Sequence, residues 1–154
     1  MNLVLADEQD DPLPAEPLLV LAEAVLRAEG CPDATEMSIV LVDEARIAEL
    51  NQDHLGRHGP TDVLSFPVED LEPGVVPVPS SGGPPLALGD VYICPAVVRR
   101  RADATGVPLD DEMGLMVVHG ILHLLGYDHG DDTDAEYMEG RERTLLEASG
   151  RSRR

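Results

Sequence analysis

The chain has 154 residues, 11 of them basic and 30 acidic, so its formal net charge at pH 7 is −19. This length suits a single domain with one core. Hydrophobic residues make up 43% and charged residues 27% of the chain, a balance that is typical of globular proteins and excludes a disordered one. The acidity also excludes an extended basic face for nucleic acid, so any contact with nucleic acid must be local and sensitive to salt.

The sequence shows no pattern of secretion or of a membrane span. Its apolar runs are shorter than the roughly 18 residues that a membrane helix needs, and residues 1–11 lack the basic start of a signal peptide. Cys31 and Cys94 lie far apart and form no CxxC pattern, which favours buried thiols in a reducing compartment over a disulfide. We therefore expect a cytoplasmic protein that does not associate with a membrane.

The first half of the chain alternates between the patterns of strands and of helices. Short β-branched and apolar runs predict strands, whereas apolar residues three and four positions apart predict helices. Asp43 has the side chain of a helix cap, and Pro67, which has no N–H to donate, ends a strand. These patterns predict strands over 2–6, 37–42 and 61–67, and helices over 15–29 and 43–55.

The second half begins with a long loop and continues mainly as helices. Residues 67–87 are rich in proline, glycine and serine and predict a long loop, a kind of segment that is often functional. Thr133 and Glu136 have the spacing of a capping box, which would begin the last helix. Strands interleaved with helices predict a single α/β or α+β domain over residues 1–150. We expect a strand over 88–94, helices over 95–105, 108–125 and 133–148, and a frayed basic tail over 151–154.

Three of the five histidines, His119, His123 and His129, fall within eleven residues. The first two are four residues apart on a predicted helix, so their imidazoles share one face and can reach one ion. Gly126 can adopt the left-handed conformation that ends a helix, which would bring His129 to a third side of the site. Three imidazole nitrogens suit one zinc ion and leave a position open for water. A metal-bound water that ionises near pH 7 is the nucleophile of a catalytic site.

A chance grouping of surface or core histidines is the alternative, and two histidines alone would leave it a serious rival. The full spacing, HxxxHxxGxxH, favours the metal site. Metallopeptidases of the metzincin type share this spacing, but they carry a glutamate as general base directly after the first histidine. That position is Gly120 here. We therefore expect a similar site geometry without the peptidase reaction.

Three segments together resemble one protein family. Residues 119–129, HGILHLLGYDH, resemble the signature of the YbeY family of bacterial rRNA maturation factors and endoribonucleases. Residues 60–67, PTDVLSFP, and 88–95, LGDVYICP, resemble that family's two other motifs in the same order. The resemblance covers most of the chain, from residue 37 to residue 146.

This resemblance implies a mixed β-sheet of about four strands flanked by helices, with a metal site at the C-terminal end of a helix. It implies one zinc ion per chain on His119, His123 and His129, and a hydrolase that cleaves phosphodiester bonds within single-stranded RNA. It further implies roles in maturation of the 16S rRNA 3′ end and in quality control of the small ribosomal subunit. Proteins of that subunit and an assembly GTPase are the partners that the family suggests.

One departure from the family concerns the residue that handles RNA. Many members carry an arginine shortly after the Leu–Asn pair that closes the second helix. Aligning Leu50 and Asn51 with that pair places Leu55 at the arginine position. Arg57, two residues later, is the candidate to replace it, and a solvated loop arginine is the equal alternative.

Several further residues are weaker candidates. Asp128 lies beside the third histidine and could orient it or accept a proton from the metal-bound water, although a turn residue is the favoured interpretation. The basic run of Arg99, Arg100 and Arg101 could contact RNA phosphates, but such runs are more often solvated helix faces. Ser65 has no neighbouring base, so we expect an ordinary strand hydroxyl instead of a nucleophile.

Two functions follow from these observations. The first is a zinc-dependent endoribonuclease in which Arg57 offsets the charge that develops on the phosphate. Attack by water and attack by a ribose 2′-OH both remain open. The second is a ribosome-assembly factor that binds rRNA and ribosomal protein, cleaves weakly or not at all, and holds a structural zinc. The net charge of −19 and the missing family arginine favour the second function.

Overall fold

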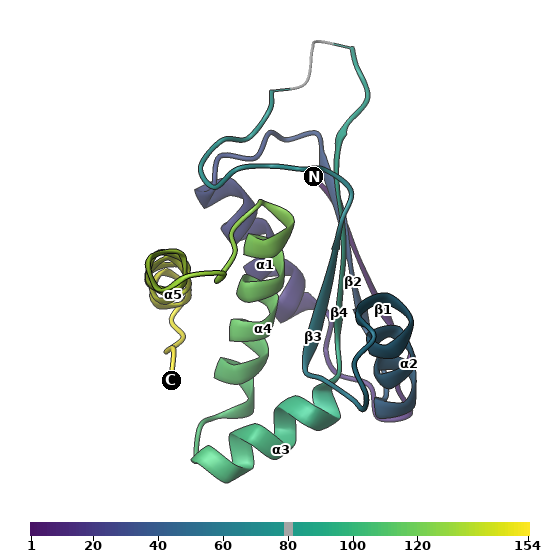
Figure 1. Ribbon diagram of the computed structural model, residues 1–154. Coiled ribbons are helices and arrows are strands. Elements are labelled where there is room, and N and C mark those ends of the chain that lie inside the picture. The colour runs from purple at the N-terminus through teal and green to yellow at the C-terminus, as the bar shows by residue number, and fades with distance from the viewer. Residues whose placement is uncertain (79–81) are drawn as a thin grey trace.

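The computed structural model describes residues 1–78 and 82–154, and these residues form a single α+β domain (Figure 1). Its strands are β1 (Asn2–Asp7), β2 (Thr35–Leu41), β3 (Val63–Pro67) and β4 (Leu86–Ile93). Its helices are α1 (Glu16–Ala28), α2 (Glu44–Leu55), α3 (Pro95–Thr105), α4 (Leu109–Leu124) and α5 (Asp132–Ala148).

Every strand and helix expected from the sequence is present, with ends that differ by one or two residues. The cap of α2 is confirmed, because Asp43 Oδ1 accepts a hydrogen bond from the backbone N–H of Arg46 at 2.9 Å. The cap of α5 is a correction. Asp131, not Thr133, begins this helix, and its Oδ1 accepts from the N–H of Asp134 at 2.7 Å. Asp131 lies two residues before Thr133, so its carboxylate accepts from an unpaired backbone N–H of the first helical turn. Its negative charge is also favourable at a helix N-terminus.

The sheet has the strand order β1-β2-β4-β3, so its mixed character is confirmed. Strands β1, β2 and β4 run parallel to one another, whereas β3 runs antiparallel to β4 at the edge of the sheet. Pro67 ends β3 as expected, and an edge strand is where a residue without an N–H is tolerated.

Helix α4 lies at the centre of the molecule. It packs against β3 and β4 on one side and against α1, α3 and α5 on its other sides. Helix α5 therefore lies on the side of α4 that faces away from the sheet (Figure 1). Nearly every residue of its second half is buried, which agrees with a helix that is apolar all round. The main core fills the space between the sheet and these helices.

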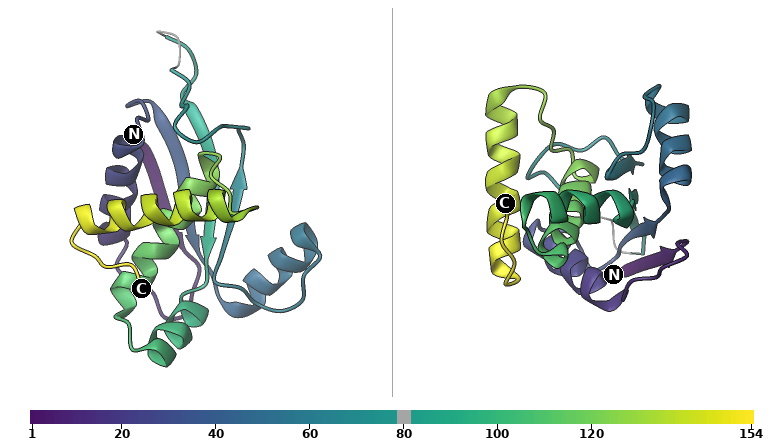
Figure 2. Two further views of the ribbon diagram at one scale, coloured as in Figure 1. Left: turned by 60° about the vertical axis from the view of Figure 1, so that its left-hand side comes forward. Right: turned by 90° about the horizontal axis from the view of Figure 1, so that it is seen from below.

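Helix α2 covers the opposite face of the sheet, and Figure 2 shows α2 and α5 on opposite sides of the molecule. A smaller cluster lies beneath α2, formed by Val42, Ile47, Leu50, Leu64 and Cys94. Both cysteines are free and buried, in agreement with the expectation of thiols. Within the described residues, no helix is long and apolar enough to cross a membrane.

A glycine allows α4 to approach the sheet closely. A Cβ placed on Gly120 would come within 2.4 Å of Val91 Cγ1 in β4. The hydroxyl of Ser65 in β3 donates to the carbonyl of Gly120 at 3.0 Å and ties the helix to the edge strand. Position 120 therefore faces the sheet, and a side chain that begins there would overlap Val91. Glycine at this position leaves the histidine motif without the glutamate that serves metzincin-type peptidases as general base.

The long segment between β3 and β4 forms no regular strand or helix in its described part, apart from a bridge between Glu72 and Val75. Part of the predicted loop over 67–87, residues 79–81, lies outside the described residues. Residues 151–154 also lack regular secondary structure, but they differ from the frayed tail expected from the sequence. The side chains of Arg153 and Arg154 contact buried carboxylates on α5 and α4.

Candidate metal centre

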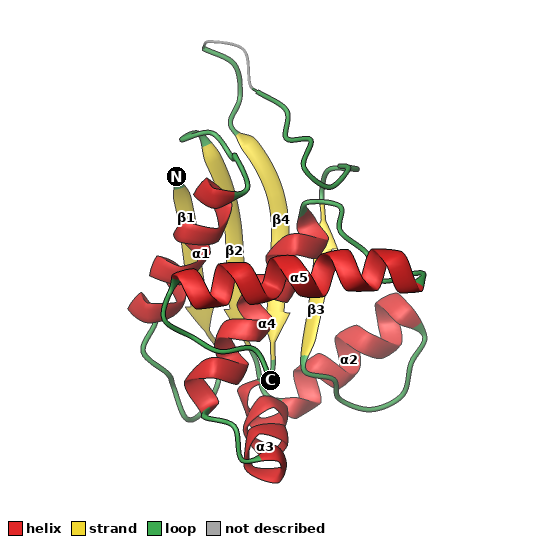
Figure 3. Cartoon of the chain, turned by 90° about the vertical axis from the view of Figure 1, so that its left-hand side faces the viewer, coloured by secondary structure: helices red, strands yellow, loops and turns green. Residues whose placement is uncertain are grey.

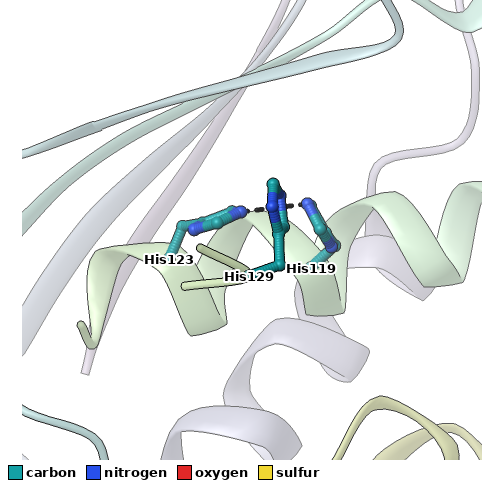
Figure 4. Close-up of side chains that lie close together, drawn as sticks. All are labelled: His119, His123 and His129. Carbon is teal, nitrogen blue, oxygen red and sulfur yellow. Dashed lines mark hydrogen bonds between the residues drawn. The ribbon is translucent and has the colours of Figure 1, made fainter. Parts of the chain in front are cut away.

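The C-terminal half of α4 brings the three histidine side chains together (Figure 4). His119 and His123 project from successive turns of α4, and their Nε2 atoms are 3.0 Å apart. The ring of His129, in the turn before α5, lies 5.7 Å from that of His119 and 5.2 Å from that of His123, centre to centre. One nitrogen from each ring lies within 4.8 Å of the others, so the three residues could hold one metal ion.

The turn that carries His129 depends on Gly126. This residue has a φ of +97°, in the left-handed region, as expected from the sequence. The N–H of Gly126 donates to the carbonyl of His123 at 3.1 Å, and that of Tyr127 donates to Leu122 at 3.0 Å. A Cβ at position 126 would lie 2.0 Å from the carbonyl oxygen of Leu71. The glycine therefore reverses the chain and also lets the loop after β3 rest on the turn.

The Nδ1 atom of each histidine on α4 lies within hydrogen-bond distance of an oxygen acceptor. His123 Nδ1 lies 2.9 Å from the backbone carbonyl of Tyr127, and His119 Nδ1 lies 2.8 Å from Glu142 Oε2. A carbonyl only accepts, so Nδ1 of His123 carries the proton. Burial acts to raise the pKa of Glu142, but the contacts with His119 and Arg153 outweigh it and lower the pKa. The carboxylate is therefore ionised and accepts from His119.

Because Nδ1 of each ring is directed at an oxygen, the two Nε2 atoms face each other, and that arrangement fits a cation. Burial, followed by the neighbouring His119, lowers the pKa of His123, so this ring is neutral at pH 7. Two unprotonated Nε2 atoms at this separation would repel each other, and a cation bound to both would remove that repulsion. Nitrogens bound at 2.0–2.1 Å to one tetrahedral ion lie about 3.3 Å apart, close to this separation. Oxygen acceptors behind ligand histidines are also typical of metal sites.

Tyr127 packs beneath the site and does not reach out from it. Its side chain is only 4% exposed, its hydroxyl donates to Glu29 at 2.5 Å, and its ring stacks on that of Tyr137. Burial, and then the contact with Glu29, raises the pKa of Tyr127. Arg141 of α5 pairs with the same carboxylate at 2.6 Å. This network joins the histidine turn to α1 and α5.

Sequence reasoning missed Glu142 and Glu29, although one signal was readable for the first. Met138, Glu142 and Leu145 are all buried, and their spacing places them on one face of α5. A carboxylate on an apolar face needs a buried partner. That signal does not identify the partner, which lies on another helix.

The histidine cluster lies in an open groove of about 650 Å³. The residues around it come from the end of α2, from the loop between α2 and β3, from β3 and from the loops after β3 and α4. They include Arg57, Asp62, Glu69, Asp70 and Asp128. Leu55, at the position of the family arginine, also lines the groove. Within the described part of the chain, Arg57 is the only arginine that lines this groove, and no ion pair engages it.

The loop that presents Arg57 is fastened to the end of α2. The N–H of Arg57 donates to the carbonyl of Asn51 at 3.3 Å, and the Asn51 side chain donates to the carbonyl of Gly59 at 3.0 Å. Asn51 is itself buried. This arrangement places the arginine and the histidines on one groove, although they are more than sixty positions apart in the chain.

The other candidates are placed differently. Asp128 accepts from the N–H of His129 at 2.8 Å, the geometry of a turn residue, and also lines the groove. Arg99, Arg100 and Arg101 lie on α3 and do not line it. Arg100 pairs with Glu44 at 2.6 Å, and Arg101 pairs with Asp62. Their contact with RNA stays a prediction.

The fold and the cluster together define an α+β protein with a mixed four-stranded sheet and a group of three histidines that could bind a metal. The family profile described as "Endoribonuclease YbeY" matches residues 6–150. A Thermobifida fusca (strain YX) protein named "Endoribonuclease YbeY" is 41% identical over 99% of this chain and 96% of its own length. A protein of the same name from Rhodococcus jostii (strain RHA1) is 40% identical over 96% of this chain and 81% of its own.

A solution structure of a Thermotoga maritima protein has a similar fold. It is 30% identical, with a TM-score of 0.63, over 96% of this chain and 87% of that one. The chain therefore belongs to the YbeY endoribonuclease family. The enzyme class expected from the sequence, a hydrolase that cleaves RNA internally, is the class of this family.

Proposed function

We propose that the chain is a zinc-dependent endonuclease for single-stranded RNA. The observation that carries this proposal is the pair of Nε2 atoms, 3.0 Å apart, in a groove that also contains Arg57, an arginine with no ion-pair partner among the described residues. We further propose that it acts in the cytoplasm, in maturation of the 16S rRNA 3′ end and in quality control of the small ribosomal subunit. Membership of the YbeY family supports this finer assignment.

Each residue of the site has a part in this proposal. His119, His123 and His129 would hold the ion, and Glu142 and the Tyr127 carbonyl fix the first two rings in position. A bound zinc ion would supply Lewis acidity towards a phosphoryl oxygen and activate a nucleophile at neutral pH.

Arg57 and Asp128 serve the substrate side of the groove. The Arg57 guanidinium would bind a phosphate and offset the charge that develops as the phosphodiester is attacked. Asp128, which also lines the groove, would accept a proton at its carboxylate. The acids Glu69 and Asp70 at the same groove disfavour the second row of phosphates that a duplex would bring, which supports a single-stranded substrate.

The test compares the wild type with His123→Ala by elemental analysis and by cleavage of a labelled single-stranded RNA and a matched hairpin. We expect about one zinc per chain and cleavage of the single strand in the wild type, and neither in His123→Ala, with both proteins folded by circular dichroism. If the wild type contains no zinc, or if the two proteins cleave the RNA equally well, the proposal is wrong.

A second pair of variants tests the role of Arg57. Arg57→Ala should lower the rate of cleavage about 10–100-fold with the zinc content unchanged, because it removes a charge-assisted contact to phosphate. Arg143→Ala, an exposed arginine of α5 away from the groove, is the matched control and should cleave as the wild type does. An equal effect of the two variants would remove Arg57 from the site.

The cellular assignment needs a cellular measurement. We expect 16S rRNA with unprocessed 3′ ends in a strain that lacks the protein, restored by the wild type and not by His123→Ala. The same strain allows small-subunit proteins and the assembly GTPase to be tested as partners by co-purification with 16S precursors.

The acidic groove favours a second function, an assembly factor that binds rRNA and ribosomal protein with little cleavage. Asp62, Glu69 and Asp70 line the groove together with Arg57, and the chain carries a net charge of −19. A basic protein surface would dock on such a rim more readily than naked RNA. Bound zinc without cleavage in the wild type, together with loss of the fold in His123→Ala, would establish this alternative.

A further inference from the structure

The C-terminal residues return across α4 after leaving α5 (Figure 3). Gly150, with a φ of +77°, turns the chain, and the N–H of Arg151 donates to the carbonyl of Leu146 at 2.9 Å. The Arg151 side chain then covers Gly114 of α4, because a Cβ at position 114 would lie 2.5 Å from Arg151 Cδ. The tail is thus fixed to α4 and α5 before it reaches its last two arginines.

Those two arginines meet two carboxylates that are almost completely buried. Glu112 of α4 is 1% exposed and Glu142 of α5 is 2% exposed. Arg154 Nε lies 2.9 Å from Glu112 Oε1, and Arg153 Nε lies 3.3 Å from Glu142 Oε1. The tail therefore supplies a positive partner to each buried negative charge, as buried charges require.

The Arg153–Glu142 and Arg154–Glu112 pairs differ in whether the carboxylate also contacts a histidine of the cluster. The second oxygen of Glu142 accepts from His119 Nδ1 at 2.8 Å, so Arg153, Glu142 and His119 form one chain of contacts. Arg153 also lines a cavity of about 180 Å³ together with His119 and His129. Glu112 contacts no histidine of the cluster within the described residues.

From this difference we propose that Arg153 is a positioning residue of the metal centre. It fixes the Glu142 carboxylate, and the carboxylate in turn fixes the tautomer and the orientation of His119. Without Arg153 the buried carboxylate loses its positive partner and is free to turn away from the ring. The proposal rests on the metal site of the proposed function.

A positioning role and a purely electrostatic role of Arg153 predict opposite changes in metal affinity when the residue is removed. One measurement therefore distinguishes them. A positive charge near the cluster repels a cation, so its removal would tighten metal binding if charge alone mattered. If Arg153 positions His119, its removal weakens metal binding instead. Replacement of a residue that directly orients a ligand costs about 10–100-fold in metal affinity, and a residue one step further away should cost less.

The experiment measures the zinc dissociation constant of the full chain by competition with a chromophoric chelator. Arg153→Ala should raise the constant about 3–10-fold, and Arg153→Lys should restore most of the loss. Arg154→Ala, which removes an equal charge from the same tail, should change it less than twofold. A lower or unchanged constant in Arg153→Ala, or equal effects of the two alanine variants, would overturn the proposal.

A second readout does not depend on metal. In the metal-free protein, nitrogen-15 spectra should show His119 as a single Nδ1–H tautomer in the wild type and in Arg154→Ala, and a mixture in Arg153→Ala. A single unchanged tautomer in Arg153→Ala would contradict the proposed contact chain. If the wild type binds no zinc, the proposed function fails, while these spectra still decide the role of Arg153. Arg153→Lys provides the same comparison if the alanine variant does not fold.

Discussion

The histidine cluster has a helical half and a loop half, and the two are built differently. His119 and His123 lie on a helix that is buried on nearly all sides, and each ring has an oxygen acceptor behind it. His129 is exposed, lies in a turn between helices, and has no acceptor behind its ring among the described residues. The helical half is preorganised, whereas the loop half must be ordered when a metal binds.

Because of this difference, the two halves contribute to metal binding in different ways. A rigid pair of nitrogens sets the position of an ion, and a third ligand on a turn can adjust to it. The turn also connects the cluster to the loop after β3 through the close contact between Gly126 and Leu71. Variants of the two halves should therefore weaken metal binding by different amounts and for different reasons.

The largest effect is expected from replacing the ligands themselves. His123→Ala and His129→Ala should each raise the zinc dissociation constant by more than the 10–100-fold typical of a residue that only supports a ligand. Ordering a side chain on binding costs about 0.5–1.5 kcal/mol, which already reduces the contribution of His129. The increase should be about threefold to tenfold larger in His123→Ala. Chelator competition measures both constants, and an equal increase would break the distinction between the halves.

Gly126→Ala tests the turn that joins the halves. A left-handed conformation costs an alanine about 1–2 kcal/mol, and the new Cβ would also overlap the Leu71 carbonyl. The free energy of unfolding should fall by more than 2 kcal/mol, and zinc affinity should fall with it. Gly56→Ala is the control, because Gly56 has a φ of +64° with open space around it. Urea titration of both variants should show the larger loss at position 126.

Glu142→Gln tests the support of the helical half. The amide keeps the shape of the side chain but loses the charge that holds the Nδ1 proton of His119, so zinc affinity should fall about 10–100-fold. Glu112→Gln removes an equally buried charge that contacts no histidine of the cluster within the described residues. Its zinc affinity should stay within about twofold of the wild type. Both can be measured by the same competition assay, and equal losses would contradict the assigned role of Glu142.

The smallest effect concerns pH. Burial, and then His119, lowers the pKa of His123 in the folded chain below its unfolded value of about 6.5. Between those pKa values the unfolded chain binds more protons than the folded apoprotein. The free energy of unfolding should therefore fall as pH decreases below about 6.5, by at most about 1.4 kcal/mol per pH unit for this group.

Urea titrations of the metal-free protein between pH 8 and pH 5.5 measure this dependence. His123→Gln should reduce the slope below pH 6.5. His58→Gln, at an exposed histidine outside the cluster, should leave it as in the wild type. A slope that is the same in both variants would show that His123 is not the group responsible.

Much of the fold could be predicted because its signals are local. The order of strands and helices follows from hydrophobic spacing, and the ends of α2 and β3 follow from Asp43 and Pro67. The cap of α5 was misplaced because Asp131 and Thr133 both have capping side chains. Their competition is decided by backbone geometry, which residue type alone does not give.

The sequence by itself determined that three histidines meet, because helical spacing and a left-handed glycine are properties of adjacent residues. Only the tertiary structure decided what supports them. Glu142, Glu29 and Arg153 reach the site from other helices and from the tail, through contacts between residues distant in the sequence. The structure also gave Gly120 its role, because a close approach to Val91 depends on how α4 packs on the sheet. Such contacts depend on how whole elements pack, which local patterns do not encode.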